Sequence, residues 1–124
     1  MSYVTYKLIH LLGVFLLLVA LAGMAAHAAA GHSKAENKAY RSLLILHGSG
    51  ALVALLGGFG LLARTGFGHG LLFPGWIWAK IVLWLLLGGI IALPYRNRPL
   101  ARILLPVLPF LGLLGGYLAT YKPF

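Results

Sequence analysis

Four long apolar segments constrain this chain more than any other feature of its sequence. They cover residues 3–30, 42–63, 75–93 and 103–120. Each is long enough to cross a hydrocarbon core of about 30 Å as a helix. Only 9% of the residues are charged, whereas a water-soluble domain carries roughly 25%. We therefore predict that residues 1–124 form a single all-α domain, a four-helix transmembrane bundle in contact with the lipid bilayer.

The links between these segments predict how the helices run. All three links are short, which favours an up-down-up-down bundle of antiparallel neighbours. The first and third links hold six basic residues, and the opposite side of the bundle holds four. The six are Lys34, Lys38, Arg41, Arg96, Arg98 and Arg102; the four are Lys7, Arg64, Lys80 and Lys122. The positive-inside rule then places both termini outside the cytoplasm.

The N-terminal segment has an alternative interpretation as a signal peptide. Lys7 precedes a long apolar run, and Ala26-His27-Ala28 resembles an A-x-A cleavage site. The run is longer than a usual signal-peptide core, and Tyr3 and Tyr6 lead it as interfacial anchors would. These features favour a first transmembrane helix.

The composition excludes several classes of function. The chain has no cysteine and only one acidic residue, Glu36, which excludes disulfides, thiolate metal sites, carboxylate pairs and a Ser-His-Asp triad. Its net charge is +9, but the basic residues lie between apolar runs, where anionic lipid headgroups are the nearest partners. We therefore expect contact with lipid and no nucleic-acid binding.

Ionisable residues inside the spans are the candidates for a site, because a charge at mid-membrane costs about 2.5–3.5 kcal/mol. His27 and His47 each lie ten residues from Asn37, the middle of the first link. In an antiparallel pair this spacing predicts one depth for both histidines, toward the cytoplasm. Met24 precedes His27 by one turn and lies on the same face.

A second group is predicted at the opposite end of the bundle. It contains Lys7, His10, Trp76 and Lys80, with His69 available from the second link. Trp76, Lys80 and Trp84 follow one another at i, i+4 and i+8, so a cation–π contact of Lys80 is available. Alternatively, Lys80 pairs with an anion or a haem propionate, or it reaches the headgroups, as Lys7 does.

Imidazole groups leave three roles open for these residues. A histidine at a membrane boundary often donates one hydrogen bond to a carbonyl and does nothing more. A b-type haem needs two ligands at one depth, which favours His27 and His47, with Gly23 and Gly50 leaving room for the ring. Copper is the other option, with a ligand set of His10, His27, His47 and Met24. Small-xxx-small patterns, including Gly112 and Gly116, indicate close helix packing and allow dimerisation.

Several short segments, kept in order along the chain, resemble the SirB family of small four-helix membrane proteins. They are residues 7–10 (KLIH), 41–47 (RSLLILH), 76–80 (WIWAK), 87–93 (LGGIIAL) and 116–120 (GYLAT). The resemblance implies a multi-pass protein of the bacterial inner membrane, and it does not imply a DNA-binding regulator. More distantly, K-x-x-H and W-x-x-x-K resemble the copper-resistance domain CopD and the haem-associated oxidase HemJ. Those relatives imply haem or copper handling, with His10, His47 and Lys80 as the positions to test.

We therefore expect a non-catalytic accessory or packing subunit of a membrane complex, associated with other membrane subunits or with copies of itself. The alternatives are a b-type haem protein in electron transfer or haem handling, with His10, His27, His47 and Lys80 around the cofactor, and a copper-handling protein. Enzymatic activity is not expected.

Overall fold

The computed structural model describes residues 2–65 and 73–124, which form helices joined by short links. The helices are α1 (Tyr3–Ala29), α2 (Tyr40–Thr65), α3 (Gly75–Gly89) and α4 (Arg98–Tyr121), with short 3-10 helices η1 (Lys34–Glu36) and η2 (Ile90–Ala92). The described residues contain no strand. Four segments, the third being α3 together with η2, are long and apolar enough to cross a membrane. The prediction of an all-α four-helix membrane protein is therefore confirmed.

The largest difference from the predicted spans is at the start of α4, which begins at Arg98 and not at residue 103. The side chain of Asn97 accepts a hydrogen bond from the Leu100 N–H at 3.1 Å and caps the helix. Pro99 lies in the first turn, where its missing N–H costs nothing. The basic residues assigned to the third link thus belong partly to the helix. Consequently, Pro106 and Pro109 lie inside α4.

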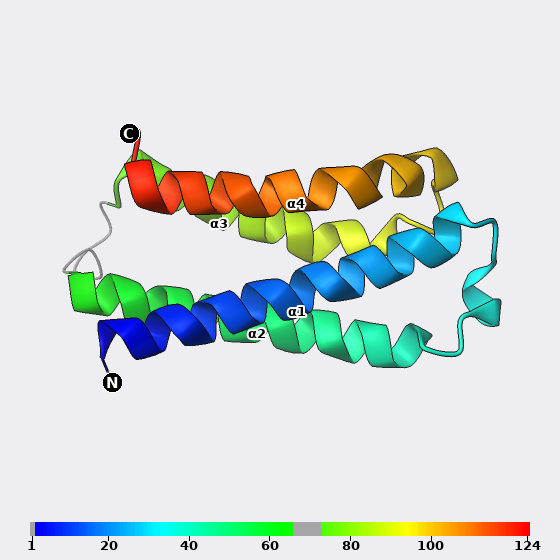
Figure 1. The fold of residues 1–124 in the computed structure, drawn as a ribbon, viewed down its shortest axis with the longest axis horizontal. Coiled ribbons are helices and arrows are strands. Elements are labelled where there is room, and N and C mark those ends of the chain that lie inside the picture. Colours follow the sequence, from blue (N-terminus) through cyan, green and yellow to red (C-terminus); the bar gives the residue numbers. More distant parts are fainter. Residues whose placement is uncertain (1, 66–72) are drawn as a thin grey trace.

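Consecutive helices run in alternating directions along the long axis, and both termini lie at the same end of the molecule (Figure 1). We call this the terminal end and the opposite one the link end. The α1–α2 pair has the most extensive contact of all the helix pairs. Gly57 faces the backbone of His10, and Gly50 faces the backbone of Leu17. The two helices are therefore antiparallel.

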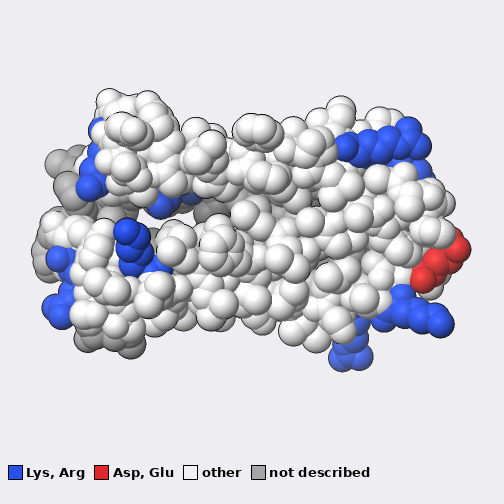
Figure 2. Space-filling view, in the orientation of Figure 1, with Lys and Arg blue, Asp and Glu red and all other residues white. Residues whose placement is uncertain are grey.

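The two hairpins, α1–α2 and α3–α4, pack on each other mainly in the middle and toward the link end. There Leu17, Leu21 and Ala25 of α1 join the main apolar core, together with Leu83 and Leu87 of α3 and Ala101, Leu104 and Leu108 of α4. A separate small cluster of Trp76, Ile77 and Leu118 lies at the terminal end. Between the main core and that end, the molecule is hollowed, as Figure 2 shows.

Charge is distributed as a membrane-spanning bundle requires. Figure 2 shows Lys and Arg at both ends and a wide band without charged side chains between them. Many large apolar side chains in this band face outward, including Phe15, Val19 and Leu113, each at least 60% exposed. An exposed apolar surface of this kind is stable against lipid and not against water. The chain is therefore a multi-pass membrane protein whose helices contact the bilayer.

Only one of the two glycines in the predicted dimerisation motif of α4, Gly112 and Gly116, is free to contact a second copy. A Cβ at Gly112 would lie 3.2 Å from a methyl group of Leu18, so Gly112 already serves contact with α1. A Cβ at Gly116 would meet nothing within 4 Å. The two glycines therefore do not form one free surface for a second copy.

Candidate functional site

A cavity of about 160 Å³ lies between the two hairpins near the terminal end, and we call it the terminal cavity. Its apolar walls come from α2, α3 and α4 and include Leu55, Phe59, Leu62, Ile77, Ile81 and Ala119. Its polar side chains are those of Tyr3, His10, Thr65, Trp76, Lys80, Trp84 and Lys122. Apolar walls with a few convergent polar groups are typical of a small-molecule site.

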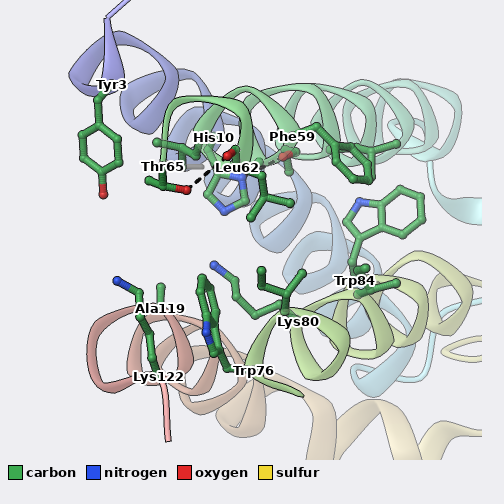
Figure 3. A pocket seen from close by; sticks show the side chains of 16 residues that line it. Tyr3, His10, Phe59, Leu62, Thr65, Trp76, Lys80, Trp84, Ala119 and Lys122 are labelled. Carbon is green, nitrogen blue, oxygen red and sulfur yellow. Dashed lines mark hydrogen bonds between the residues drawn. The ribbon is translucent and has the colours of Figure 1, made fainter. Parts of the chain in front are cut away.

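His10 enters the cavity from α1 in a fixed orientation. Its Nδ1 lies 2.7 Å from the carbonyl oxygen of Ala54, and because a carbonyl only accepts, Nδ1 carries the proton and donates. The other ring nitrogen, Nε2, points into the gap between the hairpins (Figure 3). Gly57 and Gly58 make this possible, because a Cβ at either position would lie within 3.4 Å of His10 atoms. When the ring is neutral, Nε2 is a hydrogen-bond acceptor and an available metal ligand that faces the cavity.

Two lysines give the cavity its charge. Lys80 comes from α3, and Lys122 follows α4 as its C-cap. Both amines are directed toward the gap, with the Trp76 ring between the two side chains (Figure 3). The Lys122 Nζ lies 5.5 Å from the centre of the Trp76 ring, a distance at which a cation–π attraction operates.

The backbone of Lys122 explains how the end of the chain reaches the cavity. Its φ is 48°, in the left-handed region, and its N–H donates to the carbonyl of Leu118 at 3.1 Å. A left-handed residue at a helix C-terminus turns the chain away from the helix axis, and glycine is the usual residue there. Lys122 is thus a cation–π partner of Trp76 that the sequence analysis did not name.

The deep end of the cavity is closed by Trp84. Its indole N–H donates to the Ala51 carbonyl at 3.0 Å and joins α3 to α2. Further toward the link end, His47 joins the same two helices through a 3.0 Å hydrogen bond from Nε2 to the Leu87 carbonyl. The cavity therefore runs from an apolar floor at Trp84 to a cationic mouth at Lys122.

The structure gathers most of the group predicted at this end. His10, Trp76 and Lys80 all line the terminal cavity. Lys7 is exposed and does not line it. His69 lies outside the described residues.

The pair predicted toward the cytoplasm is not brought together. In the observed register of α1 and α2, His47 lies level with Ala20, which is seven residues from His27, or about 10 Å along the helix. The error arose from counting both histidines from Asn37, because the hairpin is centred several residues earlier in the link. His27 and His47 therefore do not share the depth that two ligands of one haem iron require.

His27 instead belongs to a hydrogen-bonded network at the link end. The Tyr95 hydroxyl lies 2.8 Å from His27 Nδ1 and accepts a 2.8 Å hydrogen bond from the Asn37 side-chain amide. The same amide nitrogen lies 4.0 Å from the sulfur of Met24, which is fully buried. Nearby, Arg98 donates to the Ala28 carbonyl at 3.1 Å. This network ties both hairpins to the first link.

Two further predictions need correction. Gly23 and Gly50 do not leave room for a ring, because a Cβ at Gly23 would lie 3.1 Å from Leu43, and one at Gly50 would lie 2.6 Å from the backbone of Leu17. Within residues 2–65 and 73–124, no three side chains of the His, Cys, Asp or Glu types come close enough to hold a metal ion. The copper set of His10, His27, His47 and Met24 is therefore not assembled there.

Reasoning from the sequence missed two contributors to these sites. Lys122 was used only to predict the topology. Its position directly after an apolar run was the one feature of the sequence that could have indicated a role in the site. Tyr95 lies in the basic link and had no distinguishing neighbour. Comparison with protein-family models, curated proteins and solved structures finds no match to this chain.

Proposed function

We propose that this chain is a SirB-like protein of the bacterial inner membrane that acts as a non-catalytic accessory subunit and holds a small hydrophobic ligand in the terminal cavity. The observation that carries the proposal is the cavity itself, with apolar walls and three converging nitrogen groups from His10, Lys80 and Lys122. A bundle that served packing alone gains nothing from a void, because unfilled space forfeits packing energy.

The packing of the hairpins supports access from the membrane. α2 and α3 border the cavity from opposite sides, yet they contact each other far less than α1 contacts α2. Two hydrogen bonds between α2 and α3 involve Trp84 and His47, both toward the link end of the cavity. A ligand dissolved in the bilayer can therefore enter between these helices without breaking either bond.

A blocking variant tests this proposal. Ala119 lines the cavity from α4, whereas the neighbouring Thr120 lies on an outer groove of the same helix. Ala119→Phe places a ring in the cavity, and Thr120→Phe adds the same ring outside it. Native mass spectrometry of protein released from nanodiscs should show a retained ligand in the wild type and in Thr120→Phe, and none in Ala119→Phe. Equal retention in all three proteins would contradict the proposal.

A b-type haem is a second candidate, favoured by the orientation of His10. A metal-bound histidine usually donates its other ring N–H to a carbonyl or carboxylate, and His10 Nδ1 makes this bond to Ala54. The described residues of the cavity supply one of the two iron ligands of such a haem: His10 Nε2 would bind the iron, and Lys80 and Lys122 would pair with the propionates. Bound haem would supply one-electron chemistry at this end of the bundle.

The haem candidate has a direct spectroscopic test. The purified protein, supplemented with haem, should give a Soret band, and His10→Ala should remove it. His47→Ala is the matched control, because the His47 ring is bonded to the Leu87 carbonyl and is not among the cavity-lining residues. A featureless spectrum would exclude haem and leave the accessory role as the proposal.

A further inference from the structure

We infer that the ligand of the terminal cavity is a single-chain amphiphile with an anionic head, a carboxylate or a phosphate, held between Lys80 and Lys122. This inference rests on the proposed function, because it assigns a chemical class to the ligand of the same cavity. It is carried by the charge of the mouth, the polarity gradient along the cavity and the position of the floor.

The charge at the mouth calls for an anion. Lys80 and Lys122 both direct their amines into the gap (Figure 3). The only acidic side chain of the chain, Glu36, lies in the first link, at the opposite end of the bundle. No salt bridge joins either lysine to a carboxylate among the described residues. Lys80 is partly buried beside apolar walls, and Lys122 is exposed at the mouth. A negative group between them would offset the desolvation of Lys80 and accept charge-assisted hydrogen bonds from both ammonium groups.

The rest of the cavity is suited to a hydrocarbon chain. From Lys80, which contacts the head, to Trp84 at the floor, the cavity follows α3 for four residues, or about 6 Å. Leu55 and Ile81 line the cavity beside this stretch. The indole N–H of Trp84 at the floor is already bonded to the Ala51 carbonyl, so the deep end offers no donor from this ring to a polar ligand. A molecule with one anionic end and one apolar end matches this gradient.

The direction of the gradient agrees with that of a lipid. The cationic mouth lies at the terminal end, beside the last residue of α4, and the apolar floor lies toward the middle of the bundle. An amphiphile entering from the bilayer would keep its head near the membrane surface and its chain toward the bilayer centre. It would enter the cavity without turning over.

Tryptophan fluorescence gives a selective test. The chain has three tryptophans, and two of them, Trp76 and Trp84, line the cavity, whereas Trp78 is 51% exposed and does not. In a Trp78→Phe background all tryptophan emission comes from Trp76 and Trp84, which line the cavity. The protein is placed in phosphatidylcholine nanodiscs and titrated with brominated eight-carbon amphiphiles that differ only in the head: carboxylate, lysophosphatidate, neutral monoglyceride and primary amine. Inorganic phosphate is added as a competitor.

Lysine variants then locate the head. Lys80→Met and Lys122→Met each remove one cation and keep an unbranched chain, and Lys7→Met removes an exposed cation at the same end that does not line the cavity. We expect the anionic quenchers to bind about tenfold more weakly to either cavity variant, as the loss of one charge-assisted bond implies. The Lys7 variant and the neutral quencher should show no change. Circular dichroism in the same nanodiscs checks that each variant is folded.

The outcomes separate the inference from the proposed function. If all four heads quench equally and no lysine variant changes the titration, the cavity binds amphiphiles but the anionic assignment is wrong. If no amphiphile quenches beyond the level expected for free lipid contact, the inference and the proposed hydrophobic ligand both fail. If inorganic phosphate displaces the anionic quenchers at equal concentration, the site binds a free anion and the chain makes no contribution, which also overturns the inference.

Discussion

The close approach of α1 and α2 makes a strong prediction about Gly13. A methyl group added there would overlap the backbone nitrogen of Ala54 and would lie 2.7 Å from both the Ala54 Cα and the Gly50 carbonyl oxygen. Ordinary contact begins at 3.4 Å, so the two helices would have to separate by more than about 0.7 Å at this point. All three neighbouring atoms belong to the backbone and cannot rotate away. Gly13→Ala should therefore strain the most extensive helix pair of the bundle.

The magnitude follows from two opposing effects. Overpacking of a close contact costs about 3 kcal/mol at the upper end of its usual range. Replacing glycine by alanine inside a helix contributes about 1 kcal/mol in the opposite direction. We expect Gly13→Ala to lower the free energy of unfolding by about 2 kcal/mol. Gly48→Ala is the matched control, because a Cβ at Gly48 would meet nothing within 4 Å, and it should raise stability by up to about 1 kcal/mol.

The assay is reversible unfolding in mixed micelles with increasing dodecyl sulfate, followed by circular dichroism and tryptophan fluorescence. The free-energy difference between the two variants should be about 3 kcal/mol, because the propensity gain cancels between them. Equal unfolding curves for Gly13→Ala and Gly48→Ala would refute the close α1–α2 contact and the helix register derived from it.

Three further predictions concern the link end and the topology. Tyr95→Phe should lower the free energy of unfolding by about 1–2 kcal/mol, because it removes the hydroxyl that joins two side chains of the link-end network. In the same unfolding assay Tyr40→Phe should have little effect, because the Tyr40 hydroxyl has no hydrogen bond among the described residues. Equal losses of stability in the two variants would contradict the network. The Glu36 carboxylate accepts a hydrogen bond from the Ser33 N–H at 2.7 Å. This bond is the main reason that the pKa of Glu36 lies below its ordinary 4.5, and a bond from the Ser33 hydroxyl is the second. The stability that the ionised Glu36 contributes to the folded state is therefore fully present above pH 4.5 and is lost as the pH falls through the lowered pKa. A carbon-13 titration of this single acidic side chain should give a midpoint below 4.5, and a midpoint at or above that value would count against the bond. Because the chain has no native cysteine, Ser2→Cys should react with an impermeant maleimide in intact spheroplasts and Ser33→Cys only after lysis; the reverse pattern would invert the proposed topology.

The fold was predictable because the bilayer imposes a length and a composition on every span. Four apolar runs of sufficient length therefore predict four helices, even when the packing between the helices is unknown. Helix ends were less predictable, since they depend on individual caps. The start of α4 at Arg98 depends on the Asn97 cap and on Pro99 in the first turn. The basic residues around this point had been assigned to the third link.

The candidate site was partly predictable for the same reason. Depth along antiparallel helices placed His10, Trp76 and Lys80 at one end, and the structure brings them to one cavity. The role of Lys122 depends on a left-handed C-cap that no pattern in the sequence marks. The separation of His27 from His47 depends on which glycines meet between α1 and α2. Counting from the middle of a link cannot supply that register.

Photo-crosslinking tests the central claim, that the terminal cavity binds an amphiphile, most directly. An anionic fatty acid with a diazirine in the middle of its chain is incorporated into nanodiscs that contain the protein, irradiated, and mapped by peptide mass spectrometry. We predict adducts concentrated on cavity-lining residues of α2 and α3, between Leu55 and Leu62 and between Trp76 and Trp84, and their loss in Ala119→Phe. Adducts spread evenly over the lipid-facing side chains, such as Phe15 and Leu113, and unchanged in that variant would contradict the claim.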